Sequence, residues 1–207
     1  MGEIILVRHG QANSHATTEE DYDRLSELGH QQARWLGDWF RAHDYVFDHV
    51  VSGTMRRHRE TVAGLGLVAD EDARLNEIDY YTLSHALHHV KGEPLPTGDT
   101  FAAHMPKVFQ AWRAAEIEGA EPYHAFETRV AALLDDATQP GRRVLCVTSG
   151  GVIGMVGAGL ISLLVGLLVR DAFMQEWDVD ALNLVAAICE AIDGEVESLP
   201  AEDGANA

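Results

Sequence analysis

A short apolar run near the start of the chain constrains the fold more than any other feature. Ile4 to Val7 are all apolar, which is typical of a strand buried in a parallel sheet rather than of a half-exposed strand. The run stops at Arg8-His9-Gly10, which is a cation, an imidazole and a residue that turns freely. Open α/β sheets carry their sites at the carboxyl ends of their strands. We therefore expect an α/β fold with a functional site at the end of this first strand.

Arg8 and His9 have side chains suited to anion chemistry. An arginine guanidinium is a planar fork of donors that matches phosphate oxygens. A histidine offers a neutral nitrogen near physiological pH, which serves as a base, a metal ligand or a nucleophile. The same tripeptide also occurs in ordinary loops, so its interpretation depends on the segments that follow it.

The net charge of the chain argues against two classes of binding partner. Acidic residues outnumber Lys and Arg by 33 to 15, and the formal net charge is −18. Such a surface repels nucleic acid and anionic lipid, so we expect neither as a partner, and any anion site must be a local basic cluster. The 207 residues, 46% of them hydrophobic, suffice for one globular domain. We place this domain at residues 1–199 and expect a disordered polar tail over 200–207.

Two later apolar runs end in small polar residues and predict two further strands. The first covers Phe47 to Ser52, and the second covers Val144 to Thr148 and is followed by Ser149-Gly150-Gly151. If the strands are parallel, their carboxyl ends meet His9 at one edge of the sheet. A shorter edge strand is expected near residues 66–70.

The densest basic cluster of the chain follows the second predicted strand. Arg56, Arg57 and Arg59 lie at the start of an expected helix that Ser52 or Thr54 would cap. A helix N-terminus is itself an anion site. A solvated helix face would carry such charges too, and we expect at least one of the three arginines to point back at the strand end.

Two acids, Glu77 and Asp79, are candidates for a general acid. They lie in an otherwise apolar and aromatic stretch, and burial in such a setting raises the pKa of a carboxyl group. Carboxylates on the surface are common, so the stretch by itself is also compatible with an ordinary loop.

Helical periodicity predicts the layers that cover the sheet. The first helix has Ser26 as its N-cap and ends near His43. Further helices are predicted over residues 100–118, with a kink or a break at Pro106, and over residues 123–137. The inward faces of the first and last of these helices are Ala33, Leu36, Trp39 and Phe40, and Phe126, Val130, Leu133 and Leu134. Three histidines at nearly helical spacing would suit zinc, but no acid or Cys cluster accompanies them, which favours an exposed helix: His85, His88 and His89.

Residues 150–169 contain no charged residue and allow more than one interpretation. The stretch is long enough to span a bilayer, but it follows a strand that must pair, which favours a buried helix broken near residues 157–159. We expect no membrane association, although the apolar stretch would suit a homodimer interface. Residues 181–199 fit a helix or a hairpin, and Asp193-Gly194 favours the hairpin.

The cysteines and the N-terminus indicate the compartment. Cys146 and Cys189 both lie in apolar runs, as buried free thiols of a reducing compartment do. The first strand begins almost at Met1, so we expect no signal peptide and a cytoplasmic location.

Five segments in this order resemble the histidine phosphatase superfamily, the phosphoglycerate-mutase-like family. Together they extend over nearly the whole chain, which makes the resemblance far more specific than any single motif. It implies a three-layer α/β/α sandwich with one mostly parallel central sheet. The segments are Arg8-His9-Gly10, Leu25-Ser26-Glu27-Leu28-Gly29-x-x-Gln32-Ala33, Ser52-x-x-Met55-x-Arg57-x-x-Glu60-Thr61, Leu75-Asn76-Glu77-Ile78 and Ser149-Gly150-Gly151.

The resemblance also implies a role for individual residues. His9 would be the nucleophile that becomes a phosphohistidine, and Arg8 and Arg57 would clamp the phosphoryl oxygens. Glu77 would protonate the leaving oxygen and then activate water. Such chemistry relies on positioning and charge neutralisation by arginines, so we expect no metal and no other cofactor.

Ser149 is the main departure from the family pattern, which has a histidine before the glycine at this point. Serine keeps a short donor but loses the reach and the positive charge of a histidine that would bind the phosphoryl group. The amides of Gly150 and Gly151, His58 or another of the eleven histidines would have to compensate. The implied phosphate-binding set is Arg8, Arg57, Ser149, Gly150 and, from a shifted loop pattern, Asn13.

A phosphomonoester hydrolase is the function that this pattern favours. A phosphoglycerate-type mutase needs further basic groups at the pocket mouth, and here such groups are scattered: Lys91, Lys107 and Arg113. Ser149 keeps a third alternative open, a pseudophosphatase that binds phosphate but turns it over poorly. The substrate would be a small phosphomonoester or a phosphopeptide, with specificity set by residues 80–106, where the resemblance is weakest.

Overall fold

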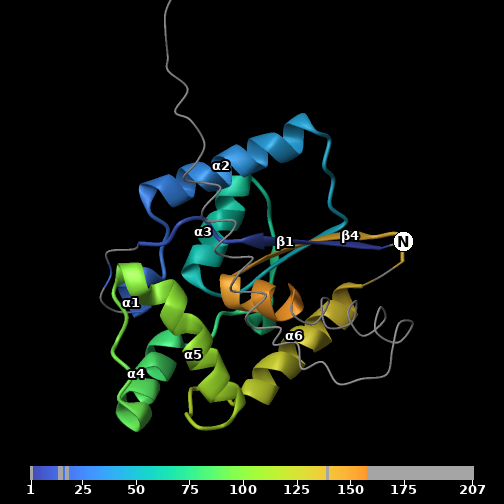
Figure 1. The fold of residues 1–207 in the computed structure, drawn as a ribbon. Coiled ribbons are helices and arrows are strands. Elements are labelled where there is room, and N and C mark those ends of the chain that lie inside the picture. Colours follow the sequence, from blue (N-terminus) through green and yellow to red (C-terminus); the bar gives the residue numbers. More distant parts are fainter. Residues whose placement is uncertain (1, 14–15, 17–18, 139, 158–207) are drawn as a thin grey trace, which may run out of the picture.

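A parallel sheet runs through the centre of the protein (Figure 1). The computed structural model describes residues 2–13, 16, 19–138 and 140–157. Within them the sheet has four strands in the order β1-β4-β2-β3, and every neighbouring pair is parallel. The strands are β1 Glu3–Arg8, β2 His49–Ser52, β3 Asp70–Glu71 and β4 Arg143–Thr148. This arrangement confirms the predicted α/β fold.

Helices connect the strands and cover both faces of the sheet. They are α1 Glu19–Tyr22, α2 Glu27–Ala42, α3 Arg56–Leu65, α4 Tyr80–Lys91, α5 Phe101–Arg113 and α6 Tyr123–Ala137. Two short 3₁₀ turns are η1 Ala73–Leu75 and η2 Gly98–Thr100, and residues 150–157 after β4 are helical as well.

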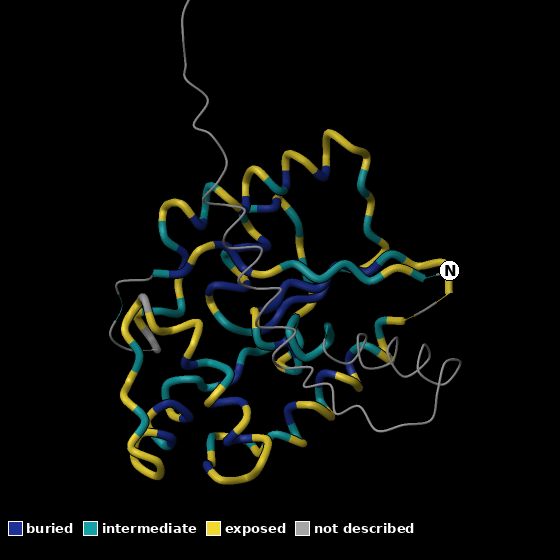
Figure 2. The backbone as a smooth tube through the Cα atoms, viewed as in Figure 1, coloured by how far each residue is buried: buried dark blue, intermediate teal, exposed yellow. Residues whose placement is uncertain are grey.

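The sheet separates two apolar cores, because side chains along a strand alternate between its faces. On β1, Ile4 and Leu6 pack into the larger core, whereas Ile5 and Val7 pack into the smaller one. Helices α2 and α3 cover the smaller core, and α4, α5 and α6 cover the larger one (Figures 1 and 2). The protein is therefore a three-layer α/β/α sandwich, as the resemblance implies.

Aromatic side chains of α5 and α6 form the centre of the larger core. The Trp112 and Phe126 rings lie 5.6 Å apart between centroids, and both side chains are buried. The indole N–H of Trp112 donates to the Glu121 carbonyl oxygen at 3.0 Å, so its polar atom is satisfied. Burial of one large apolar side chain contributes about 1.5–3 kcal/mol, and such contacts hold this layer against the sheet.

Most of the predicted helix and strand positions are confirmed. The Ser26 hydroxyl accepts from the Gly29 amide and caps α2, and the predicted helix over residues 123–137 is α6. The helix predicted over 100–118 is shorter, since α5 ends at Arg113, and it contains Pro106. The edge strand expected near 66–70 is β3, and the three α4 histidines lie on an exposed face: His85, His88 and His89.

Two expectations about burial are wrong. Ile4 to Val7 are half-buried rather than fully buried, because β1 pairs with β4 alone among the described strands. Trp39 is 46% exposed, although the helical pattern places it inward. A Cβ on Gly37 would lie 2.5 Å from the Leu65 carbonyl oxygen, so α2 packs closely on α3 along the Gly37 side. This contact turns position 39 outward.

Several expectations for the C-terminal part lie outside the described residues. They are the helix beyond residue 157 with its break near 157–159, the helix or hairpin over 181–199, Cys189 and the tail over 200–207. Cys146 is a buried free thiol in β4, as predicted. In the part of the chain that the structure describes, no helix combines the length and apolarity that a membrane crossing requires.

Candidate active site

The carboxyl ends of three parallel strands bring the candidate residues together. The His9 N–H donates to the Thr148 carbonyl oxygen at 2.9 Å, which continues the register of β1 and β4. The Gly53 N–H donates to the Val147 carbonyl oxygen at 3.0 Å and continues the register of β2 and β4. His9, Gly53 and Ser149 therefore leave the sheet at the same edge, as the sequence predicts.

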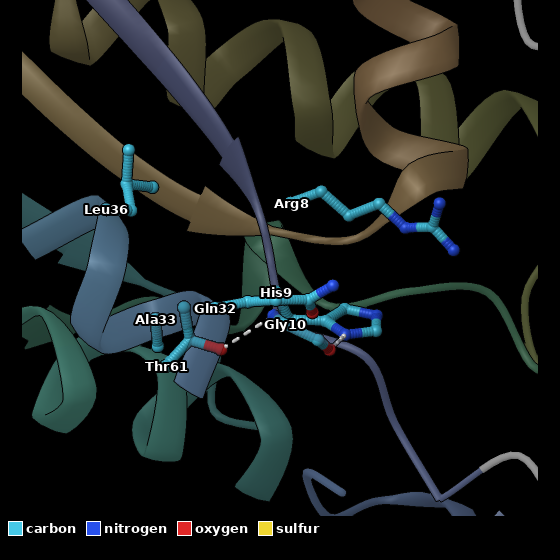
Figure 3. A pocket seen from close by; sticks show the side chains of 7 residues that line it. All are labelled: Arg8, His9, Gly10, Gln32, Ala33, Leu36 and Thr61. Atoms are coloured by element: carbon cyan, nitrogen blue, oxygen red, sulfur yellow. Dashed lines mark hydrogen bonds between the residues drawn. The ribbon is translucent and has the colours of Figure 1, made fainter. Parts of the chain in front are cut away.

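His9 has one ring nitrogen committed to the backbone. Its Nδ1 lies 2.7 Å from the Gly10 carbonyl oxygen (Figure 3). A carbonyl oxygen only accepts, so Nδ1 carries the proton and Nε2 keeps its lone pair. Burial lowers the pKa of His9 to about 4; the Gly10 bond opposes this shift, and the nearby cations Arg57 and Arg8 add to it. The ring is therefore neutral near pH 7, with Nε2 available as a nucleophile.

Arg57 is a buried cation in the first turn of α3. Its side chain is 1% exposed, and its Nη1 forms an ion pair of 3.0 Å with the Asp23 carboxylate. The guanidinium carbon also lies 5.2 Å from the centroid of the Tyr22 ring. Arg56 and Arg59 instead form ion pairs on the surface, so one of the three arginines points back at the strand end, as expected.

Asp23 caps α3, which corrects the predicted cap at Ser52 or Thr54. Its carboxylate accepts from the backbone N–H groups of Arg56 at 3.0 Å and Arg57 at 3.2 Å. The N-cap position itself is Met55, whose side chain makes no capping bond. A carboxylate from a distant loop satisfies the helix N-terminus here, and a local sequence pattern does not reveal such a cap.

Arg8 extends across the start of the helix that follows β4. A Cβ on Gly150 would lie 3.6 Å from Arg8 Nε, so the side chain passes along this glycine at van der Waals distance. The side chain is exposed, and no described residue forms an ion pair or a side-chain hydrogen bond with its guanidinium. Its donors are therefore available to an anion that enters beside His9.

Glu77 holds its carboxylate at the same edge. Oε2 accepts from the Gly151 N–H at 2.9 Å, and Oε1 accepts from the Ile78 N–H at 3.0 Å. A Cβ on Gly151 would lie 2.2 Å from Oε1, so only glycine allows this approach. Desolvation raises the pKa of Glu77, and it outweighs the two amide bonds and the cations Arg57 and Arg8. A raised pKa is the property that a proton donor near neutral pH requires.

Ser149 forms a buried pair with His58. From the sequence, His58 was one of several groups that could compensate for the serine at position 149. Its hydroxyl oxygen lies 2.7 Å from His58 Nε2, and both residues are 0% exposed. The His58 ring centroid is 5.7 Å from that of His9. Burial lowers the pKa of His58 to about 2, and His9 and Arg57 contribute in the same direction. His58 is therefore neutral at every physiological pH.

Polar side chains of α2 and α3 hold the loop after β1 in place. The Gly10 N–H donates to Thr61 Oγ1 at 3.1 Å, and the Gln11 N–H donates to Gln32 Oε1 at 2.8 Å. Glu60 Oε2 accepts from the backbone N–H of Leu25 at 2.7 Å. These supporting roles were missed at the sequence level, although Gln32, Glu60 and Thr61 belong to the motif positions.

Not every predicted site residue joins the cluster. The side-chain amide of Asn13 donates to the Asp21 carbonyl oxygen at 3.2 Å, within its own loop, so its proposed contact with phosphate stays a prediction. A hollow of about 210 Å³ lies on the α2 and α3 side of the same strand end. Arg8 and His9 line this hollow together with Ala33 and Leu36. Figure 3 shows the Arg8 guanidinium and the His9 ring extending away from Leu36 and Ala33.

A family model identifies the class of protein to which this arrangement belongs. The model of the histidine phosphatase superfamily, branch 1, matches residues 4–173. The chain therefore belongs to the histidine phosphatase superfamily. The match extends from the first strand past residue 157, the last residue that the structure describes, so it includes all residues of the candidate site.

Individual curated relatives match only part of this chain. The serine/threonine-protein phosphatase Pgam5, mitochondrial, of Drosophila willistoni is 33% identical over 122 residues, which are 56% of this chain and 38% of that protein. The counterpart from Drosophila persimilis is 32% identical over 120 residues, with the same coverage of 56% and 38%. The chain thus matches well under half the length of these curated relatives.

Solved structures support the phosphoglycerate-mutase-like fold. A mycobacterial glucosyl-3-phosphoglycerate phosphatase in complex with VO3 is 26% identical, with a TM-score of 0.50 and coverage of 77% of this chain and 82% of that chain. The phosphoglycerate mutase of Bacillus anthracis is 22% identical, with a TM-score of 0.57 and coverage of 77% and 80%. The second likeness shows the fold alone.

Proposed function

We propose that this protein hydrolyses phosphomonoesters through a phosphohistidine on His9. The observation that carries the proposal is the hydrogen bond of 2.7 Å between His9 Nδ1 and the Gly10 carbonyl oxygen. It leaves the Nε2 lone pair free in a ring that burial and two arginines keep neutral. A neutral imidazole beside Arg8 and Arg57 is an arrangement suited to attack on a phosphoryl group.

The first step transfers the phosphoryl group to the enzyme. The Nε2 lone pair of His9 forms a bond to phosphorus while the bond from phosphorus to the ester oxygen breaks. Glu77, whose pKa is raised, gives its proton to the departing oxygen. Arg8 and Arg57 neutralise the charge on the remaining phosphoryl oxygens.

The second step releases phosphate and restores the enzyme. The Glu77 carboxylate takes a proton from a water molecule whose oxygen attacks phosphorus, and the bond to His9 Nε2 breaks. Inorganic phosphate leaves, His9 regains its lone pair and Glu77 is protonated again. We propose that no metal takes part, because the two arginines supply the positive charge that phosphoryl transfer needs.

The names of the relatives support a proposal for the substrate class. The curated relatives are named serine/threonine-protein phosphatases, and one solved relative is named a phosphatase of a sugar phosphate. We propose that this chain acts on a small phosphomonoester or a phosphopeptide. A mutase is disfavoured, since Lys91 and Lys107 already form ion pairs with the carboxylates of Glu116 and Glu93.

The test is hydrolysis of p-nitrophenyl phosphate, phosphoserine and a phosphothreonine peptide in the presence of a chelator. We expect the wild type to turn over at least one of them and the His9→Ala variant to be inactive. Full activity of His9→Ala would overturn the proposal, because the element that carries the chemistry would then be dispensable. Activity that requires an added metal would overturn the metal-free mechanism.

A pseudophosphatase is the second candidate, because Ser149 stands where relatives of this family have a phosphate-binding histidine. Single-turnover labelling with a radioactive phosphomonoester separates the two functions. An enzyme accumulates acid-labile phosphohistidine and then releases phosphate, whereas a phosphate-binding relative does neither while it still binds inorganic phosphate. The His9→Ala variant is the matched control for the label.

A further inference from the structure

We propose that His58 and Ser149 act as one unit that replaces the missing second histidine, with His58 orienting the Ser149 hydroxyl toward a phosphoryl oxygen. The inference deepens the proposed function and rests on it. Ser149 is fully buried in the structure, so it contacts the substrate only once neighbouring side chains move aside as the phosphoryl group enters. His58 is a positioning residue that acts through Ser149. The imidazole then reaches the site from helix α3 rather than from the end of β4.

The contact between the two side chains is close and fully enclosed. His58 Nε2 and Ser149 Oγ lie 2.7 Å apart, and neither residue is exposed to solvent. The two residues are 91 positions apart in the sequence, so only the parallel register of β2 and β4 brings them together. A buried hydrogen bond of this length holds both groups in one orientation.

The pair lies among the groups that would bind the phosphoryl oxygens. The His58 ring is 5.7 Å from the His9 ring between centroids. Next along the chain from Ser149, Gly150 lies against Arg8 and the Gly151 N–H binds Glu77. A donor at Ser149 Oγ therefore lies beside the nucleophile, one of the cations and the acid.

The surroundings fit closely around the imidazole of His58. A Cβ on Gly53 would lie 2.1 Å from His58 Nδ1, so the ring fits only because residue 53 has no side chain. A histidine at position 149 in the same rotamer would enter the volume that the His58 ring fills, because its Cγ would take the place of Oγ, which already lies 2.7 Å from His58 Nε2. The small residues at 53 and 149 are thus complementary to an imidazole at 58.

The proton on His58 decides what Ser149 offers to an anion. A neutral imidazole carries one N–H, and we assign it to Nε2, where it donates to Ser149 Oγ. Nδ1 faces Gly53 and accepts no hydrogen bond from the residues that the structure describes. With Oγ accepting from His58, the hydroxyl hydrogen of Ser149 is free to be donated to a phosphoryl oxygen.

The first test compares two substitutions of His58, one with a hydrogen-bond donor and one without. In His58→Gln the amide nitrogen reaches the place of Nε2, whereas His58→Leu fills a similar volume without a donor. We expect Ser149→Ala and His58→Leu each to lower kcat/KM about 10- to 100-fold, and His58→Gln to retain most of it. Equal losses in His58→Gln and His58→Leu would overturn the proposal, since packing alone would then explain both.

Double variants test whether the two residues act as a unit. We expect kcat/KM of the Ser149→Ala, His58→Leu double variant to be no lower than that of either single variant. If the two residues act together, the first substitution already removes their joint contribution. We expect His58→Ala combined with Ser149→His to recover activity above His58→Ala alone, since it returns an imidazole to the same volume. Independent, multiplying losses or a swap without recovery would overturn the proposal.

Binding of inorganic phosphate, followed by calorimetry, is a readout that does not depend on turnover. We expect affinity to fall in Ser149→Ala and in His58→Leu but not in His58→Gln, with near-ultraviolet circular dichroism confirming the fold of each variant. Unchanged affinity of Ser149→Ala for inorganic phosphate would overturn the proposal that Ser149 and His58 act as a pair, even if the enzyme is active. Failure of the proposed function appears differently, as turnover by His9→Ala.

Discussion

Helices α3 and α4 carry similar residues, yet only α3 builds the site. In α3, Arg57 and His58 are buried beside His9, whereas α4 exposes His88 and His89 to solvent. The difference follows from where each helix begins. Helix α3 starts at the end of β2, a strand flanked by β4 and β3, so its first turn is enclosed by the sheet edge. A cation or an imidazole gains a function here through its position, and residue type alone does not predict it.

The contrast also exists within α3 itself. Arg56 and Arg59 form ion pairs with Glu60 and Glu71 on the surface, where such pairs contribute little to stability. Arg57 lies one residue away and is almost completely buried. Neighbouring arginines therefore allow a matched comparison between a site residue and a surface residue of the same helix turn.

Arg57→Ala is the substitution with the largest expected effect. We expect kcat/KM to fall about a thousandfold, because the variant loses a preorganised buried cation and leaves Asp23 without its ion pair. Arg59→Ala is the control, and we expect it to change kcat/KM by no more than about twofold. Steady-state hydrolysis of p-nitrophenyl phosphate measures both. Equal losses in the two variants would contradict the assignment of Arg57 to the site.

Glu77→Gln is expected to come next, with kcat lower by about 10²- to 10⁴-fold, because the variant cannot give a proton to the leaving oxygen. The pKa of Glu77 is raised, so wild-type activity should fall as pH rises through it. The pKa of His9 is lowered to about 4, so activity should also fall below that pH as the nucleophile takes up a proton. A profile of kcat/KM against pH measures both limbs.

The control for Glu77 is Asp79→Asn, two residues along the chain. Asp79 accepts from the Thr82 N–H at 3.0 Å and caps α4, and asparagine is an equally good cap. We expect this variant to keep its kcat and the alkaline limb of its pH profile. If the limb is lost in Asp79→Asn and kept in Glu77→Gln, the acid has been assigned to the wrong carboxyl group.

Gly53→Ala tests the space that His58 occupies and is expected to have a smaller effect. The added Cβ would lie 2.1 Å from His58 Nδ1, so the ring must move, which costs about 1–3 kcal/mol of unfolding free energy. Gly98→Ala is the control, because nothing lies within 4 Å of a Cβ there. Urea denaturation measures the difference. Equal stability of the two variants would mean that the site is looser than the structure shows.

The smallest expected effect is on the pH dependence of the unfolding free energy, which distinguishes the buried His58 from the exposed histidines. The pKa of His58 is lowered from 6.5 to about 2, so between these values the unfolded chain binds a proton that the folded chain does not. Stability from this group is therefore full above pH 6.5 and is lost as pH falls, by at most about 1.4 kcal/mol per pH unit. His58→Gln should reduce this slope between pH 7 and pH 5.

His88→Gln on the exposed face of α4 is the matched control for this slope. Glu77 acts in the opposite direction because its pKa is raised, but its contribution is common to both variants and cancels in the comparison. Urea denaturation at pH 5 and pH 7 gives the slope for each protein. A slope that changes in His88→Gln and not in His58→Gln would reverse the distinction between the two helices.

Much of the fold was predictable because it depends on local patterns. The apolar runs predict β1, β2 and β4, and Ser26 caps α2 because its hydroxyl reaches an amide three residues ahead. The exposure of Trp39 was not predictable, since it depends on the close approach of α2 to α3 at Gly37. Helical periodicity defines a face but does not say which part of that face a neighbouring helix will cover.

For the site, the sequence by itself determined which chemical groups are present and in what order: Arg8, His9, Arg57, Glu77 and a serine at 149. Only the tertiary structure decided that Asp23 holds Arg57 and that His58 binds Ser149. The physical reason is that these contacts join segments far apart in the chain. They depend on strand register and on the space left by glycines, which no local pattern of residues encodes.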